Sequence, residues 1–378
     1  MDLDQSYPSI SDLRARAQRR IPRFVWDYLD SATGKEAALQ RNRDKLDEIL
    51  FDPAILSGEI EANLGKSFLG RDYPLPFGIA PVGMSGMMWP EAEKHLAQLG
   101  RAENIPYGLS TVATQTPETI APHCGDARWF QLYPPRDPEI RKNMLGRIKA
   151  AGFDTLVLTA DVPVASRRER QRKGGMSVPP KLTPRILTQI ALRPAWAMAT
   201  MQHGLPRMRF IESYTGAASA ATSTKHMGYL IRTSPDWDYL RWIRDAWEGH
   251  LIVKGVLVPE DAVRLREEGV DAAWVSNHAG RQFDAAPAPI EVLPGIRAAV
   301  GPDYPLIFDS GISGGLDILR AIALGADFVM LGRAFHYGLA AFGPAGAAHV
   351  VHILREDLKS NLGQMGLAGY EGLAARLR

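Results

Sequence analysis

Short apolar runs alternate with longer amphipathic segments along most of the chain. Between the runs, apolar residues recur every three to four positions, which predicts helices over 91–103, 138–151 and 259–268. Gly152, Gly269 and Gly325 follow helix-like segments, where a left-handed cap is typical. The runs are rich in β-forming residues and predict eight buried strands at 77–81, 106–110, 128–132, 154–159, 251–255, 272–277, 305–309 and 328–332.

This alternation of strand and helix predicts a parallel sheet. Eight strands are the number that closes a (β/α)8 barrel, and polar or charged residues follow most of the runs. In a barrel these residues meet at one mouth, whereas a doubly wound open sheet would spread them along an edge. We therefore predict an α/β fold, a (β/α)8 TIM barrel, in a single domain over 1–378.

The alternation of strand and helix patterns does not extend over the whole domain, which divides the domain into parts. We expect an N-terminal helical segment at 1–70, the barrel at 71–345 and a C-terminal helical segment at 346–378. Segment 175–235 is too long for an ordinary connection, so we interpret it as an excursion that forms a lid or a partner or membrane surface. Within it, 186–201 is apolar but carries Arg193 and Pro194, which suits the surface of a membrane rather than a crossing.

Composition removes several classes of protein. The 44 Lys and Arg residues nearly balance the 42 Asp and Glu residues, for a net charge of +2, so we expect no nucleic-acid partner. Cys124 is the one cysteine, which rules out an intrachain disulfide and a Cys-rich metal site. We predict no metal and a reducing, cytoplasmic setting.

Two stretches carry candidate acid–base chemistry. His278 follows the sixth run and Arg281 comes three residues later, while Asp161 follows the fourth run and precedes a basic stretch at 167–173. A histidine at a strand end can exchange a proton near neutral pH, an arginine can bind a carboxylate, and a buried aspartate can orient the histidine. The alternative is a capping histidine, a surface arginine and a solvated basic loop.

Two further features point to an anionic ligand. The glycine-rich stretch 309–315 and the sequence LGRA at 331–334 follow the last two runs, where barrels often bind phosphate, and Arg333 adds charge. Lys254 ends an apolar run, where a charge needs an anionic partner. It could form a Schiff base or stand beside a cofactor that becomes anionic.

Together these motifs carry a family likeness. IAPVG, LSTVAT, WFQLY, LTADVP with RRER, LIVKGV, VSNHAGRQ, DSGISGGLDILRAIALGAD and LGRA occur in this order. The sequence resembles the FMN-dependent α-hydroxy-acid dehydrogenases and oxidases over nearly its whole length, a family that includes L-lactate and mandelate dehydrogenases and glycolate oxidase. The resemblance implies non-covalent FMN and oxidation of a small (S)-2-hydroxy acid, lactate-, mandelate- or glycolate-like, to the 2-oxo acid.

The resemblance also implies roles for individual residues. His278 matches the base and Asp161 the carboxylate that pairs with it. Arg281 and Arg168 match the arginines that bind the substrate carboxylate. Tyr28 and Tyr133 match the tyrosines that hydrogen-bond to the substrate, and Lys254 matches the lysine beside flavin N1 and O2. The implied cofactor contacts are Ala80, Pro81, Val82, Ser110, Gln131, Thr159, Lys254, Ser276, Asp309, Gly311, Gly332 and Arg333.

Four positions depart from the family pattern. Ser313 stands where members usually carry a phosphate-binding arginine, Val112 where hydroxy-acid oxidases carry a tryptophan, and Ala279 where a glycine is common. Gly83 is more frequent in dehydrogenases than in oxidases. The electron acceptor (oxygen, a quinone or a cytochrome) and the choice between carbanion and hydride chemistry stay open.

From the family we expect a homotetramer, cytoplasmic or peripheral on the inner face of the membrane. Three alternative functions stay open: a non-redox phosphate-binding barrel lyase that uses Lys254, an FMN barrel of another reaction class such as a diphosphate isomerase, and a binding protein without catalysis.

Overall fold

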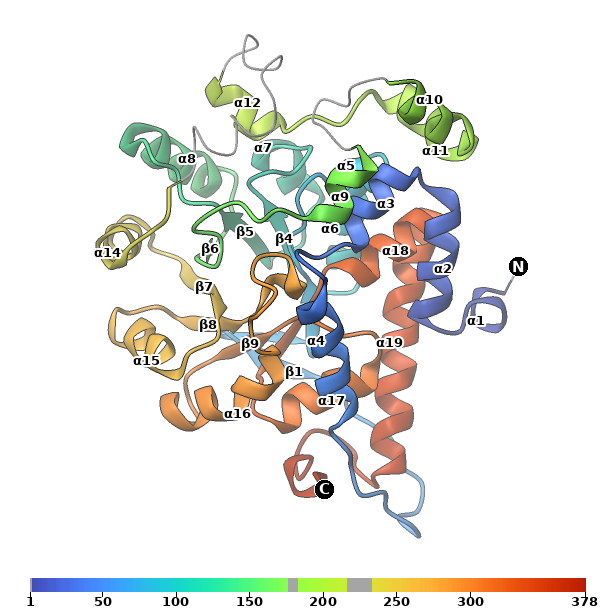
Figure 1. Cartoon of the computed structure of the whole chain (residues 1–378). Helices are drawn as coiled ribbons and strands as arrows, with labels where there is room; N and C mark the ends of the chain where they lie inside the picture. Colours follow the sequence, from blue (N-terminus) through green and yellow to red (C-terminus); the bar gives the residue numbers. More distant parts are fainter. Residues whose placement is uncertain (1, 176–182, 216–232) are drawn as a thin grey trace.

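A closed barrel of eight parallel strands forms the centre of the protein (Figure 1). The computed structural model describes residues 2–175, 183–215 and 233–378. The strand order around the barrel is β10-β3-β4-β5-β6-β7-β8-β9, which closes the sheet on itself. The strands are β3 Phe77–Ile79, β4 Tyr107–Ser110, β5 Arg128–Leu132, β6 Thr155–Thr159, β7 His250–Val256, β8 Ala272–Val275, β9 Leu306–Phe308 and β10 Phe328–Leu331. All eight predicted strands and the predicted barrel are therefore confirmed.

Helices cover the outside of the barrel, as the amphipathic segments predicted. The predicted helices are present as α6 Ala92–Ala102, α8 Pro138–Ala150 and α15 Pro259–Glu267. The caps Gly152, Gly269 and Gly325 have φ angles of 80°, 74° and 109°. The other helices around the barrel are α5 Ser85–Met88, α7 Pro117–Ile120, α14 Trp237–Ala246, α16 Pro289–Val300, α17 Gly315–Ala323, α18 Arg333–Phe342 and α19 Pro344–Gln364.

The N-terminal segment is helical only in part, which corrects the prediction for 1–70. It contains α1 Leu3–Ser6, α2 Ile10–Arg20, α3 Arg23–Asp30 and α4 Ala37–Asp47, and Pro22 separates α2 from α3 as the N-cap of α3. An antiparallel hairpin follows, with β1 at Lys66–Phe68 and β2 at Arg71–Tyr73. The hairpin strands KSF and RDY lack the continuous apolar run that predicted the barrel strands, so they left no signal in the sequence.

This hairpin packs against the base of the barrel. The ring of Phe68 stacks on Phe328 of β10 at 5.0 Å between centroids, and Tyr73 lies 5.2 Å from the same ring. Phe68 also lies 6.2 Å from Trp129 of β5. Aromatic packing therefore covers one end of the barrel, and the opposite end holds the candidate site.

Helix α9 Glu169–Gly174 comes directly before the excursion, which contains α10 Pro184–Ala191, α11 Pro194–His203 and α12 Arg209–Thr215. Residues 176–182 and 216–232 of the predicted lid or partner surface lie outside the described ranges. Ile186 and Trp196 are buried against the body, and the Trp196 indole donates to the Met87 carbonyl at 2.9 Å. In the described ranges, no helix is both long and apolar enough to cross a bilayer.

Candidate active site

The predicted site residues lie together at the carboxyl ends of the barrel strands. Each strand contributes residues near or beyond its carboxyl end, and Tyr28 comes from α3. Those ends carry Ala80, Pro81 and Val82 (β3), Ser110 (β4), Gln131 and Tyr133 (β5), Thr159 and Asp161 (β6), Lys254 (β7), Ser276, His278 and Arg281 (β8), Asp309 and Gly311 (β9), and Gly332 and Arg333 (β10). Arg168 follows β6 at the start of α9.

His278 is paired with a carboxylate. Its Nδ1 lies 3.1 Å from both carboxylate oxygens of Asp161, although the two residues are 117 positions apart. Burial lowers the pKa of His278 below its usual range, Asp161 opposes that shift, and the charges of Lys254 and Arg168 reinforce it. Burial would raise the pKa of Asp161, but His278 and Lys254 lower it overall. The pair is therefore a neutral imidazole beside an ionised carboxylate at neutral pH.

The backbone around His278 is in an uncommon conformation. His278, Ala279 and Gly280 have φ angles of 56°, 53° and 74°, so two residues with side chains are left-handed in succession. Such conformations cost about 1–3 kcal/mol each and cluster at functional sites. Gly255 supports the same pair from β7, since a Cβ there would lie 2.3 Å from the Cβ of Asp161.

Lys254 faces polar partners in the interior of the mouth. It is 6% exposed, its Nζ donates to the Ser276 hydroxyl at 2.5 Å, and it forms an ion pair with Asp309 at 3.1 Å. The same hydroxyl accepts from the His278 backbone N–H at 3.0 Å. Lys254 therefore connects the ends of β7, β8 and β9, and its charge lies within range of the His278–Asp161 pair.

Arg281 is a buried cation without a carboxylate partner among the described residues. It is 8% exposed, its Nε has no hydrogen-bond partner, and its guanidinium donates to the Tyr28 carbonyl and lies 5.2 Å from the Tyr28 ring. Burial and the nearby charges of Arg168 and Arg333 lower the pKa of Arg281 to about 9, while Tyr28 and Tyr133 oppose the shift. Neighbouring cations that repel one another and lack a carboxylate partner favour binding of an anion.

A row of buried polar side chains crosses the floor of the mouth. Ser110 donates to Gln131 Oε1 at 2.7 Å, and Gln131 Nε2 donates to Thr159 at 2.9 Å. On the adjacent wall, the backbone at Gly332 packs closely against Val82, because a Cβ on Gly332 would lie 3.0 Å from the Val82 side chain. This combination of a polar row and a side-chain-free wall suits a flat ligand with hydrogen-bonding edges.

The two candidate phosphate-binding turns differ. The α17 N-terminus is occupied by the protein itself, because Asp357 accepts from the backbone N–H groups of Gly315 and Leu316. The α18 N-terminus has no side-chain cap, and Arg333 stands at its first position without a carboxylate partner among the described residues. The α18 terminus is therefore the one better suited to an anion.

Several residues that shape the mouth had no signal in the sequence. Asn42 of α4 and Asn277 exchange amide hydrogen bonds of 2.9 and 2.6 Å, which ties the N-terminal segment to the loop of His278. Asp30 and Glu36 accept from Arg170, two positions after Arg168. Each bond joins residues more than 100 positions apart, so only the packed fold brings the partners together.

A different arginine stands beside Ser313. Arg43 of α4 donates to the Ser313 hydroxyl at 2.9 Å and to the Gly311 carbonyl at 3.0 Å. The same guanidinium forms ion pairs with Asp47 and Asp317 at 2.5 Å each. A cation therefore lies beside Ser313, where family members usually carry an arginine, but two carboxylates already neutralise the charge of this cation.

Comparison with known proteins gives consistent matches over the whole chain. The sequence pattern of the FMN-dependent dehydrogenases matches residues 17–377. The (S)-mandelate dehydrogenase of Pseudomonas putida is 36% identical over 365 residues, which cover 96% of this chain and 92% of that protein.

Solved structures agree with this match. A crystal structure described as the monotopic membrane protein (S)-mandelate dehydrogenase aligns with a TM-score of 0.90 at 35% identity and covers 98% of both chains. A mandelate oxidase bound to (S)-2-phenylpropionate aligns with a TM-score of 0.82 at 29% identity, again over 98% of both.

Proposed function

The chain belongs to the family of FMN-dependent dehydrogenases and is an FMN-dependent 2-hydroxy-acid dehydrogenase or oxidase, and from this premise we propose that it oxidises an (S)-2-hydroxy acid to the 2-oxo acid. The observation that carries this proposal is the neutral imidazole of His278, held by the ionised Asp161 carboxylate, beside the uncompensated guanidinium of Arg281. A base next to a carboxylate-binding site is what removal of a proton from a 2-hydroxy acid requires.

The residues at the mouth fit FMN. The row Ser110–Gln131–Thr159 offers donors and acceptors to the edge of a flat ring, and the wall at Gly332 allows a ring to approach the backbone. Lys254 supplies a positive charge, and Arg333 with the uncapped α18 N-terminus would hold the phosphate. When bound, FMN accepts the two electrons removed from the α-carbon.

The protein's own groups divide the remaining work. Arg281 and Arg168 would bind the substrate carboxylate and fix the orientation of the α-carbon. His278 takes a proton at Nε2, because Nδ1 faces Asp161. Asp161 then stabilises the imidazolium by a charge-assisted hydrogen bond. Tyr28 and Tyr133 would orient the substrate from the same side of the mouth, because both tyrosines interact with Arg281.

We propose mandelate as the first candidate substrate. The relatives named above are mandelate enzymes, and Val112 is smaller than the tryptophan that hydroxy-acid oxidases carry at this position. Gly83 lies directly beside Val112, since a Cβ on Gly83 would lie 2.6 Å from the Val112 side chain. A small residue at each position favours a substrate with a bulky side chain.

Anaerobic bleaching of the flavin tests this function. We expect (S)-mandelate to bleach the yellow enzyme in a single turnover, (S)-lactate and glycolate to do so more slowly, and (R)-mandelate to leave the spectrum unchanged. Reoxidation by oxygen or by a soluble quinone, followed in the same cell, then identifies the acceptor. A flavoprotein that no 2-hydroxy acid bleaches would contradict the proposal.

We also propose that the protein contacts a membrane from one side. The exposed apolar side chains of the excursion are Leu187, Leu192, Met198, Met201 and Leu205. They belong to α10, α11 and the turn after them, which lie at the outside of the molecule in Figure 1. A related dehydrogenase is described as a monotopic membrane protein. The homotetramer and the inner-face location stay predictions.

Vesicle flotation tests the membrane contact. Leu192 and Met201 are 65% and 84% exposed, so Leu192→Gln with Met201→Gln should leave the fold intact. Because two large apolar side chains would no longer enter the lipid, we expect vesicle binding to fall by about tenfold or more. Leu56→Gln is the control, since Leu56 is 99% exposed but lies next to the C-terminal end of α19. Equal losses in the two variants would rule out this surface.

A further inference from the structure

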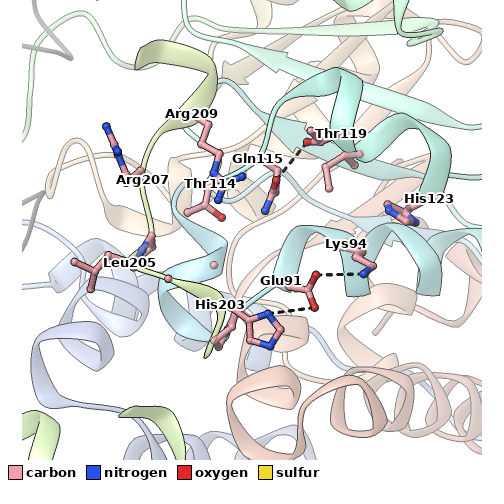
Figure 2. A pocket seen from close by; sticks show the side chains of 15 residues that line it. Glu91, Lys94, Thr114, Gln115, Thr119, His123, His203, Leu205, Arg207 and Arg209 are labelled. Carbon is pink, nitrogen blue, oxygen red and sulfur yellow. Dashed lines mark hydrogen bonds and ion pairs between the residues drawn. The ribbon is translucent and has the colours of Figure 1, made fainter. Parts of the chain in front are cut away.

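A polar pocket of about 330 Å³ lies on the outside of the barrel, separate from the candidate active site (Figure 2). One wall is helix α6 with the residues before it, and another is the loop after β4 that leads into α7. Segment 203–209, from the last residue of α11 to the first of α12, closes the third side. None of the residues assigned above to catalysis or FMN lines this pocket.

The charges around the pocket are unbalanced. Lys94, Arg207 and Arg209 face a single lining carboxylate, Glu91. Glu91 is already engaged by Lys94 at 3.2 Å and lies 3.6 Å from His203. Arg207 is held by Glu212 at 3.1 Å. These pairings leave Arg209 as the lining cation without a carboxylate partner in the described ranges, and its charge favours an anionic ligand.

Arg209 is the cation available to such a ligand. Its guanidinium forms no ion pair or hydrogen bond within the described ranges, and Figure 2 shows its side chain extending toward Gln115 and Thr114. Gln115 Oε1 accepts from the Thr119 hydroxyl at 3.3 Å, so the Gln115 amide N–H groups are left to donate. Arg209 and Gln115 thus present donors from one side, opposite Lys94 and His203.

The floor of the pocket is held in place before any ligand binds. Gly86 and Thr114 line it, and both donate to the buried carboxylate of Glu93, Thr114 through its N–H at 2.7 Å and its hydroxyl at 2.8 Å. A Cβ on Gly86 would lie 2.2 Å from the Thr114 hydroxyl, which shows how closely the two loops approach. A preformed floor lowers the entropic cost of binding.

We propose that this pocket binds a phosphate group, as a monoester or a diester. A phosphate presents oxygens in several directions and can accept from both sides of the pocket, whereas the two oxygens of a carboxylate lie on one side. The group can come from a soluble phosphate ester or from a phospholipid headgroup. The second source has a structural reason, because the exposed side chain of Leu205 lines the pocket and the exposed Met201 comes two residues before the lining residue His203.

The phosphate site is independent of hydroxy-acid oxidation, and only its lipid source rests on the proposed membrane contact. The FMN-loaded full-length protein should be titrated calorimetrically with sn-glycerol 3-phosphate. In parallel, it should be floated with vesicles of phosphatidylglycerol or of phosphatidylcholine. Flavin bleaching by (S)-mandelate, measured separately, reports on the oxidase function and should not change in the variants below.

The decisive variants are Arg209→Gln and Arg185→Gln. Both arginines are exposed and lie on the excursion, but Arg185 belongs to α10 and does not line the pocket. We expect Arg209→Gln to weaken binding of at least one phosphate probe by about tenfold, while Arg185→Gln leaves it unchanged. Lys94→Gln, on the opposite wall, should weaken the same probe.

Each result has a defined meaning. Saturable binding of glycerol 3-phosphate that depends on Arg209 supports the site with a soluble source, and Arg209-dependent preference for phosphatidylglycerol vesicles supports it with a lipid source. Equal losses from Arg209→Gln and Arg185→Gln, or no saturable binding to either probe, overturn it. If neither vesicle type binds the wild-type protein, the membrane contact fails while the calorimetric arm still decides the pocket.

Discussion

Replacing His278 with glutamine should lower kcat by about a thousandfold and leave a folded, yellow protein. Glutamine keeps a polar group of similar size beside Asp161 but cannot accept a proton near neutral pH. Steady-state rates and anaerobic bleaching with (S)-mandelate measure the loss. Because bleaching is slowed while flavin absorbance is kept, the result separates loss of the base from loss of the cofactor.

The pH dependence gives a second readout of the same residue. His278 accepts a proton only when it is neutral, so kcat/KM should rise with pH through the pKa of His278. Burial lowers that pKa, which puts the acid limb below the usual histidine range of about 6.5. The limb should vanish in His278→Gln. His352→Gln, at an exposed histidine paired with Asp4, should change neither kcat nor the limb. Normal turnover by His278→Gln would refute the assignment of the base.

Replacing Arg281 with methionine should lower kcat/KM by about a thousandfold and yet make the protein more stable. The guanidinium is buried and lacks a carboxylate partner among the described residues, so we expect the substrate carboxylate to form an ion pair with it. Loss of a buried charge pair commonly removes several kcal/mol of binding. Methionine fills a similar volume without a charge, so Tm should rise by about 2 °C.

The sign of the stability effect follows from proton linkage. The pKa of Arg281 is about 9 in the folded protein, against 12.5 for a free guanidinium. Between these values the unfolded chain binds more protons, so the free energy of unfolding rises with pH there, and below about 9 the full penalty of the buried charge is present. At neutral pH its removal therefore stabilises the fold.

Kinetics and calorimetry check both parts of this prediction. In the wild type, kcat/KM should fall as pH rises through about 9, because deprotonated Arg281 no longer attracts the substrate carboxylate. Arg281→Met should lack that alkaline limb. Arg19→Met, at an exposed arginine of α2, is the matched control and should move neither Tm nor kcat/KM. A variant with unchanged kcat/KM, or with a clearly lowered Tm, would contradict this account of the site.

The stability of the protein and the activity of its site therefore oppose each other at the mouth. Non-glycine residues with positive φ angles include Met84, Arg168, His278, Ala279 and Ser310, all in loops at the carboxyl ends of barrel strands. An uncompensated buried arginine stands in the same place. The surrounding barrel and its helices hold these unfavourable features, which is why they persist in the native state.

Local patterns along the chain are enough to predict the barrel, and the polar residues that follow its strand runs indicate the chemical character of its mouth. Strand runs and helix periodicity are local, so they predict the eight strands and three of the covering helices, α6, α8 and α15. In a parallel barrel, chain direction alone brings every strand end to one mouth, so the residues that follow the runs were expected to meet there before any contact was known.

The contacts around those residues became visible only in the packed fold. The family resemblance already implies the pairing of His278 with Asp161, but nothing in the sequence indicates the exchange between Asn42 and Asn277 or the approach of Arg43 to Ser313. The hairpin Lys66–Tyr73 and the pocket beside Arg209 likewise arise where separate elements pack. Such contacts depend on which surfaces bury one another, and a one-dimensional pattern carries no record of that choice.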